Sequence, residues 1–174
     1  MSLINTAVHI KPLVLTPEFF AQVAAWHHHE CERQGLKSTL ALRQQRLQLH
    51  IQREDIPQTL VAVAGQQLLG CVSLVSYHLL ANNDDSSARQ LAPIWLTNLF
   101  VHQDSREQGL GTLLVNAAVR YASTLDMTEI WLSAAEFTPF YQKRGWEIMR
   151  HARLGGRQVN IMRLQMGQSL VARD

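Results

Sequence analysis

The feature that most constrains the fold is a strand, a glycine-containing turn, a helix and a second strand that follow one another between residues 94 and 134. The segment IWLTNLFV (94–101) is an apolar run typical of a buried strand, and TEIWLSA (128–134) predicts another. Between them, one apolar helical face is predicted by the spacing of Leu110, Leu113, Leu114, Ala117, Ala118 and Tyr121. Strand–helix–strand connections of this kind are right-handed, so the segment predicts one crossover unit of an α/β domain.

The rest of the chain predicts further strands and helices around this unit. In chain order, we expect a strand over 7–15, helices over 16–32 and 38–54, a hairpin over 59–79, the crossover unit, a short helix over 138–145 and a hairpin over 146–166 that turns on Gly155 and Gly156. Thr16 followed by Pro17 is a typical start of the first helix, with the threonine as its cap. The pattern predicts an α/β fold with a mixed sheet.

Composition excludes several classes of function. The 174 residues are 47% hydrophobic and 17% charged, which is ordinary for a globular protein. A formal net charge of +2 is too mild to predict a nucleic-acid partner, and no apolar run approaches the ~20 residues of a membrane span. The two cysteines, Cys31 and Cys71, fit a reducing compartment better than a disulfide framework. With no signal-peptide core at the N-terminus, we expect a cytoplasmic protein.

The turn itself, DSREQGLGTLL (104–114), invites comparison with the known phosphate-binding loops. It has neither the spacing nor the lysine of a P-loop, and Leu114 stands where the dinucleotide fingerprint has its third glycine. What remains is the pattern R-x-x-G-x-G, with Arg106, Gly109 and Gly111, directly after a strand and at the start of a helix. This position is suited to an anion, but the pattern by itself does not identify one.

The physical chemistry of a helix start explains why an anion would bind there. The first N–H groups of a helix have no partner within it, and the helix dipole adds partial positive charge. Glycines let an anion approach the backbone, so a diphosphate could bind the amides of residues 108–112, with help from the Thr112 hydroxyl and the Arg106 charge. An ordinary helix start in a tight turn explains the same residues, and the two interpretations stay open at this point.

A second segment, FYQKRGW (140–146), lies one strand beyond the helix. With LFVHQDSREQGLGTLLVNAAVRYA before it, this part of the chain resembles the GNAT superfamily of acetyl-CoA-dependent N-acetyltransferases. That family has the motif [Q/R]-x-x-G-x-[G/A], followed one strand later by FYxxxG[FW]. The resemblance runs from about Thr59 to Met166. It implies a single domain over 1–174, with a mixed, mostly antiparallel sheet of about seven strands and about four flanking helices.

The resemblance also implies acetyl-CoA as cosubstrate, with no metal, and assigns residues to it. The strand 98–101 would splay away from its neighbour, so that pantetheine pairs with backbone groups at Leu99, Phe100 and Val101, where an N–H could also polarise the thioester. The pyrophosphate would be held by Arg106, Glu107, Gln108, Gly109, Leu110, Gly111 and Thr112. Tyr141 aligns with the tyrosine that protonates the departing thiolate, although packing beside Phe140 is the alternative.

This chain departs from the family at a residue that contacts the pantetheine and at the general base, which stays unassigned. Many relatives have an asparagine where this chain has Ala134, and many have a glutamate on the strand before the glycine motif, whereas IWLTNLFV contains no acid. The proton of the acceptor amine must then leave through water, a backbone carbonyl, or a group elsewhere, such as Glu30 or His78.

The resulting hypothesis is an N-acetyltransferase that moves an acetyl group from acetyl-CoA to a primary amine by direct attack. The acceptor would be a small molecule or a peptide, its identity is not encoded in any motif, and the resemblance leaves a homodimer open. A non-catalytic acyl-CoA-binding module is the main alternative. A nucleotide-binding α/β protein unrelated to CoA is a third class, although it lacks the required glycine spacing.

Other polar clusters have simpler explanations. Consecutive helical residues diverge by about 100°, so His27, His28 and His29 are not expected to bind one metal ion together, and a solvated helix is the stronger interpretation. The acidic loop with Asp84 and Asp85 is expected to be solvated. An exposed helix face is predicted for Arg43, Arg46 and Arg53. Lys143 and Arg144 are expected near the phosphates of the cosubstrate or at the solvated surface.

Overall fold

The protein folds around one seven-stranded mixed sheet in the order β1-β2-β3-β4-β5-β7-β6. The computed structural model describes residues 7–52, 55–76 and 93–167. The strands are β1 (Val8–Pro12), β2 (Gln58–Ala64), β3 (Gln67–Ser76), β4 (Ile94–Val101), β5 (Glu129–Ala134), β6 (Glu147–Leu154) and β7 (Arg157–Gln165). The helices are α1 (Phe20–Arg33), α2 (Leu40–Gln48), α4 (Leu110–Thr124) and α5 (Thr138–Gln142). The predicted α/β class, the mixed sheet and the four helices are confirmed.

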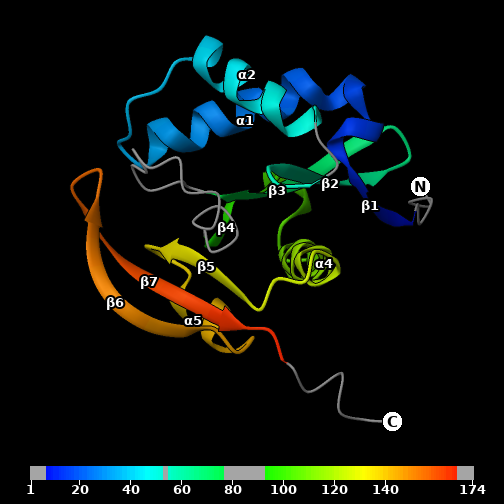
Figure 1. Ribbon diagram of the computed structural model, residues 1–174. Helices are drawn as coiled ribbons and strands as arrows, with labels where there is room; N and C mark the ends of the chain where they lie inside the picture. Colours follow the sequence, from blue (N-terminus) through cyan, green and yellow to red (C-terminus); the bar gives the residue numbers. More distant parts are fainter. Residues whose placement is uncertain (1–6, 53–54, 77–92, 168–174) are drawn as a thin grey trace, which may run out of the picture.

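The helices cover both faces of the sheet (Figure 1). Helices α1 and α2 lie over one face, where Val23, Ala24 and Leu47 pack against Val61 and Cys71 of β2 and β3. Helix α4 lies on the other face and packs its predicted apolar side into a larger core. That core also holds the aromatic residues at and just after α5. Each face therefore has its own apolar core, which the sheet separates.

The middle of the sheet opens into a fork. All adjacent strands pair antiparallel except β4 and β5, which are parallel as the crossover unit requires. Over the described residues, β4 pairs with β5 only at Ile94 and Trp95. Beyond Trp95 the two strands diverge, so the remainder of β4 lacks a neighbour on that side. This confirms the predicted splaying of residues 98–101 and creates a gap in the sheet at its centre.

The predicted N-terminal elements are shorter in the structure. The strand ends at Pro12, and the next residues form two 3-10 turns, Leu13–Leu15 and Pro17–Phe19, before α1 begins. The expected threonine cap is wrong, because the Thr16 hydroxyl donates back to the carbonyls of Pro12 and Leu13 instead. Helix α2 does have a threonine cap, since Thr39 Oγ1 accepts from the Leu42 amide at 3.1 Å. It ends at Gln48 in a 3-10 turn, which is a common way for a helix to tighten at its C-terminus.

The two hairpins follow the sequence patterns closely. The β6–β7 hairpin turns on Gly155 and Gly156, with φ angles of 56° and 77°, the left-handed region that two-residue hairpin turns require. The β2–β3 hairpin turns between Ala64 and Gln67. Among the described residues, no helix is both long and apolar enough to cross a membrane.

Candidate active site

The site begins at an irregularity in β4, next to the fork. The pairing of β4 with β3 passes from Thr97 to Phe100 and leaves out Asn98 and Leu99. Asn98 has a φ of 54°, a left-handed conformation that asparagine tolerates better than most residues. Its carbonyl accepts a bond from the Cys71 thiol at 3.6 Å. The bulge therefore turns backbone groups of β4 out of the ladder at the point where β5 has already diverged.

The glycine turn follows directly. Gly109 is the N-cap of α4, and its φ of 79° is open to glycine at little cost. No side chain caps the first turn of the helix, so its leading amides remain available. Residues 106–109 are exposed, Gly111 and Thr112 are half-buried, and the Leu110 side chain is buried in the core, which leaves only its backbone for a ligand.

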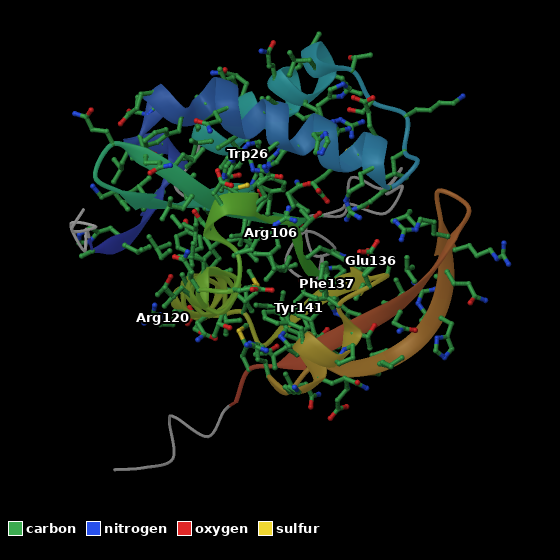
Figure 2. The ribbon with its side chains drawn as sticks, turned by 180° about the vertical axis from the view of Figure 1, so that it is seen from behind. Trp26, Arg106, Arg120, Glu136, Phe137 and Tyr141 are labelled. Carbon is green, nitrogen blue, oxygen red and sulfur yellow. The ribbon has the colours of Figure 1, made fainter. Side chains whose placement is uncertain are left out.

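Arg106 is fixed against the end of β4. Its Nε donates to the Val101 carbonyl at 2.9 Å, and its guanidinium lies 5.8 Å from the centre of the Phe100 ring. Figure 2 shows Arg106 between Trp26 of α1 and Tyr141 of α5. These contacts hold the positive charge of the exposed Arg106 side chain beside the glycine turn.

The second motif of the sequence folds back onto the first. The Arg144 guanidinium donates to the Thr112 hydroxyl and, at 2.7 Å, to the Phe140 carbonyl, and it stacks 3.7 Å above the Phe140 ring. The Phe140 ring also lies against Gly111, since a Cβ there would be 3.7 Å from it. Arg144 thus supports the first turn of α4, whereas Lys143 is exposed. The glycine turn and the FYQKRGW segment, which a helix and a strand separate in the sequence, are therefore in direct contact in the fold.

Tyr141 lies beneath this junction, at the base of the fork. Its ring makes edge-to-face contacts with Phe140, at 5.1 Å between centroids, and with Trp146, at 5.8 Å. Burial raises the pKa of the Tyr141 phenol to about 12, with the nearby Arg144 charge acting in the opposite direction. The phenol is therefore neutral at physiological pH. The side chain is 7% exposed, and that small exposed part faces a cavity.

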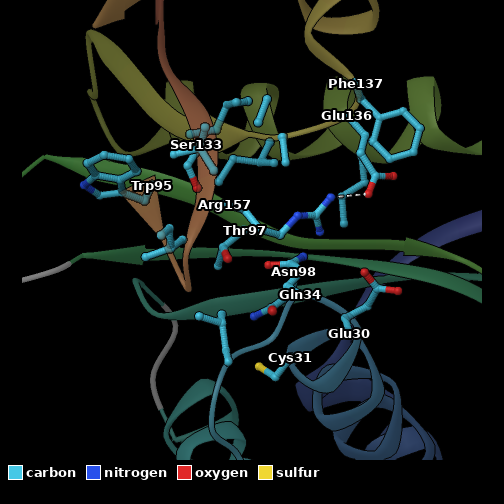
Figure 3. A pocket seen from close by; sticks show the side chains of 18 of the residues that line it. Glu30, Cys31, Gln34, Trp95, Thr97, Asn98, Ser133, Glu136, Phe137 and Arg157 are labelled. Atoms are coloured by element: carbon cyan, nitrogen blue, oxygen red, sulfur yellow. Dashed lines mark hydrogen bonds and ion pairs between the residues drawn. The ribbon is translucent and has the colours of Figure 1, made fainter. Parts of the chain in front are cut away.

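This cavity has a volume of about 620 Å³ and occupies the fork. It is bounded by β4 and β5, by α1, α2 and the segment between them, and by the β6–β7 hairpin. Figure 3 shows Glu30 and Cys31 of α1 across the space from Glu136 and Phe137, which follow β5. Trp95 of β4 also lines it. Trp26 instead packs on Phe100 at 4.6 Å.

Ion pairs cross the mouth of the cavity. Arg33 of α1 binds Glu30 at 3.0 Å and Glu136 at 3.1 Å, and Arg157 of β7 binds Glu136 at 2.7 Å. Figure 3 shows Arg157 reaching toward Glu136. Hydrogen bonds from Arg157 and then from Arg33 hold the pKa of Glu136 below its usual range. Four side chains from three parts of the fold thus form one network, which no local pattern in the sequence indicated.

The expected solvated helix face at the three histidines is wrong for His27. His27 is buried, and burial, assisted by the charges of His50 and Arg43, lowers its pKa to about 3. His28 instead contacts Glu32 at 2.6 Å. No group of three metal-ligating side chains is found among residues 7–52, 55–76 and 93–167. Both cysteines are buried free thiols. His78, Asp84 and Asp85 lie outside the described residues.

The arginines of α2 correct a prediction. An exposed helix face was predicted for Arg43 and Arg46; Arg46 is exposed as predicted, whereas Arg43 is half-buried, and both line the cavity. Arg53 lies outside the described residues. Sequence reasoning missed this because the arginines face the β6–β7 hairpin, which is more than a hundred positions away along the chain. Their helical spacing alone does not distinguish a cavity wall from a solvated surface.

Solved structures share this fold. A GNAT-family acetyltransferase from Streptococcus pneumoniae matches with a TM-score of 0.62 at 17% identity, over 92% of this chain and 100% of that one. A GCN5-related N-acetyltransferase from Kribbella flavida matches at 0.67 and 15%, over 92% and 98%. The N-acetylglutamate synthase of Neisseria gonorrhoeae, solved with coenzyme A and N-acetyl-glutamate, matches at 0.64 and 16%, over 93% of this chain and 36% of that one.

A comparison with curated proteins found no match. The family comparison did: residues 55–148 match the model of the acetyltransferase (GNAT) domain. That range contains the fork, the glycine turn, α4 and the segment with Tyr141, whereas α1, α2 and most of the β6–β7 hairpin lie outside it. The chain belongs to the GNAT family of acetyltransferases.

Proposed function

We propose that this protein transfers an acetyl group from acetyl-CoA to a primary amine by direct attack on the thioester. The observation that carries the proposal is the convergence of the two motifs at the fork, where Arg144 joins the α5 segment to Thr112 of the glycine turn. The family supplies the acyl-transfer chemistry, and the arrangement of this chain's residues supports a place for each end of the cosubstrate. Structural neighbours with bound coenzyme A support the same ligand.

The residues present suit acetyl-CoA. The uncapped first turn of α4 would hold the pyrophosphate with the help of Arg106, as oriented amides and a nearby cation favour an anion. The unpaired side of β4 at Leu99, Phe100 and Val101 would pair with the pantetheine arm as a strand would. Such positioning is the main source of rate available to a site without a metal or a covalent intermediate.

Tyr141 is proposed as the proton donor to the departing thiolate. It lines the cavity at the fork, and its phenol is neutral because burial raises its pKa to about 12. A free thiol has a pKa of about 8.5, so the phenol is the weaker acid and would deliver its proton only as the C–S bond breaks. Its hydrogen bond to the developing thiolate would stabilise the leaving group.

The general base stays unassigned. Glu30 lines the cavity, but Arg33 donates to both of its carboxylate oxygens at 3.0–3.2 Å. Glu136 is held in the same way by two arginines. Both carboxylates are therefore already bound by arginines, and we propose that the amine loses its proton to water before it attacks.

Two other functions compete with this proposal. The absence of an acid from β4 and the presence of Ala134 would fit a non-catalytic acyl-CoA-binding module, and Tyr141 in the cavity favours the enzyme. A nucleotide-binding protein unrelated to CoA is disfavoured by the family match and by the glycine spacing.

The test uses the whole chain with acetyl-CoA and a panel of amines: amino acids, polyamines, aminoglycosides and peptide N-termini. We expect CoA release and an acetylated product, identified by mass spectrometry, with at least one class. Tight CoA binding without any acetylation would support the binding module. Thermal stabilisation by nucleotides and none by CoA would support a nucleotide-binding protein unrelated to CoA.

The remaining expectations belong to the same proposal. We propose that residues 1–174 act as one acetyltransferase unit, that the site needs no metal, and that the protein works in the cytoplasm. The two buried free thiols fit a reducing compartment. Whether two copies associate is open to measurement by light scattering.

A further inference from the structure

The cavity at the fork is strongly cationic. Two acidic residues, Glu30 and Glu136, line its described walls. Six cationic residues line the same walls: Arg33, Lys37, Arg43, Arg46, Arg153 and Arg157. Such an excess is not a property of the whole chain, whose formal charge is only +2. Positive charge is therefore concentrated at this cavity, which attracts anions and repels cations.

The two acids are already neutralised within the walls. Glu30 is paired with Arg33, and Glu136 is paired with both Arg33 and Arg157. Among the described residues, no carboxylate forms an ion pair with the four other cations, Lys37, Arg43, Arg46 and Arg153. These four charges, from both sides of the cavity, are available to a ligand.

Arg43 is the most informative of them. It is half-buried, and its Nε is inaccessible to water without a hydrogen-bond partner in the described structure. A guanidinium that has lost part of its water shell is costly unless an anion replaces that water. Carboxylates and phosphate-like groups match the planar donors of arginine particularly well. The buried Nε is itself closed to a ligand, but Arg43 lines the cavity, so an anionic oxygen group that binds its guanidinium from the cavity would offset this cost.

We propose that the acceptor of this enzyme is a primary amine that also carries an anionic oxygen group, such as a carboxylate or a phosphonate, and that Arg43 binds this group. The inference rests on the proposed acetyl transfer and specifies its substrate class. Polyamines and aminoglycosides, which carry several positive charges, are disfavoured because they would face the unpaired cations. The uncharged part of the acceptor would lie along Trp95 and the apolar walls.

The experiment compares amines that differ only in this charge. Amino acids with the amine at different distances from the carboxylate are each paired with their carboxamide, and aminoalkyl phosphonates and spermidine complete the panel. With acetyl-CoA saturating, we expect kcat/KM for the anionic member of at least one pair to exceed that of its amide by about tenfold or more, which corresponds to the ~1.4 kcal/mol of one good charge-assisted contact.

Arg43→Gln tests the assignment within that comparison. It should abolish the preference for the anionic member while CoA affinity, measured by calorimetry, stays within about twofold. Arg43→Lys keeps the charge but loses the planar guanidinium, so it should retain part of the preference. Such partial retention would show that the loss in Arg43→Gln does not come from misfolding. Arg120→Gln is the matched control, since Arg120 is exposed on α4, away from the cavity (Figure 2).

The outcomes separate this inference from the proposed function. Absence of CoA binding would refute the acetyltransferase itself. Normal CoA binding with equal rates for both members of every pair, with activity confined to spermidine, or with no acetylation in the whole panel would overturn the anionic acceptor. Weaker CoA binding in Arg43→Gln would show instead that this arginine serves the cosubstrate.

Discussion

The two ends of the fork are built in different ways. The end proposed for acetyl-CoA comes mainly from one continuous stretch, from the bulge at Asn98 to Thr112, with support from Arg144. The cavity end is assembled from α1, α2, β4, β5 and the β6–β7 hairpin, which are distant in the sequence. Residues that are neighbours in the sequence can form a recognisable sequence motif. Residues that only the packing of distant elements brings together cannot. This is why the cosubstrate was predictable and the acceptor was not.

The two faces of the sheet also differ in polarity. The core beneath α4 is mostly apolar and aromatic, and its edge holds a buried polar side chain, Gln58, which donates to the Tyr121 hydroxyl. Beneath α1 and α2, polar groups are buried as well: His50 Nδ1 lies 2.8 Å from Thr59 Oγ1, which is 2.7 Å from Ser73 Oγ. His27 is buried on the same side, and its Nε2 has no hydrogen-bond partner in the described structure. The helices over the cavity therefore depend on neutral buried imidazoles, and α4 does not.

The largest effect is expected at the point where the two ends meet. Tyr141→Phe removes only the phenol oxygen, so it should lower kcat by about tenfold or more while CoA affinity changes little, the signature of a proton donor. Initial rates and calorimetry would check this with any accepted amine. An unchanged kcat would assign Tyr141 to packing.

The control for this variant is a second, half-buried phenol. Tyr121 of α4 accepts a bond from the Gln58 side chain at 3.3 Å and does not line the cavity. Tyr121→Phe should therefore leave kcat within about twofold, although it can lower the melting temperature through the lost hydrogen bond. A comparable loss of kcat in both variants would point to a general structural effect.

An intermediate effect is expected at the cosubstrate end. Gly109→Leu places a side chain at the start of α4, where it would hinder the approach of an anion, and should weaken CoA binding by about tenfold, or ~1.4 kcal/mol. Calorimetric titration with CoA measures it. Intact affinity would count against a phosphate site at this turn.

Gly156→Leu separates hindrance from backbone strain. Gly156 has a φ of 77°, against 79° at Gly109, and a Cβ would meet nothing within 4 Å at either position. Both variants should therefore lose a similar stability, about 1–2 kcal/mol for a left-handed non-glycine residue. Only Gly109→Leu should affect CoA affinity.

The smallest effect on activity is expected for the two buried histidines at the cavity end, which act on stability in acid. Burial lowers the pKa of His27 to about 3 and that of His50 to about 4, so between these values and the unfolded value of about 6.5 the unfolded chain binds more protons. The free energy of unfolding should thus fall as the pH drops below about 6.5. Each histidine contributes a slope of at most ~1.4 kcal/mol per pH unit, and His27→Leu should remove its share in urea titrations.

Hydrogen exchange would connect this effect to the comparison of the two faces. Amides of α1 and α2 should lose protection in mild acid before those of α4. His29→Leu, at an exposed position of the same helix, serves as the control and should leave the pH dependence of unfolding unchanged. Equal loss of protection on both faces would contradict the difference that we infer.

Much of the fold followed from local patterns. Apolar runs and helical spacing predicted β4, α4, β5 and both hairpins. Each of these elements buries apolar residues, which therefore recur along the sequence with the spacing of a strand or a helix. The predictions were less accurate at the N-terminus, where Pro12 ends the strand and Thr16 bonds backward instead of capping a helix. Element ends depend on a few competing hydrogen bonds, which periodicity does not resolve.

The sequence by itself determined the family, the crossover unit and the glycine turn, since the residues of a helix start are neighbours in the chain and their chemistry is local. Only the tertiary structure decided which arginines face a cavity, which acids are already paired, and that the Nε of Arg43 has no hydrogen-bond partner within the described part of the chain. Those properties depend on distances between elements far apart in the sequence. Coulombic and hydrogen-bonding energies depend on separation in space, and the folded chain alone sets that separation.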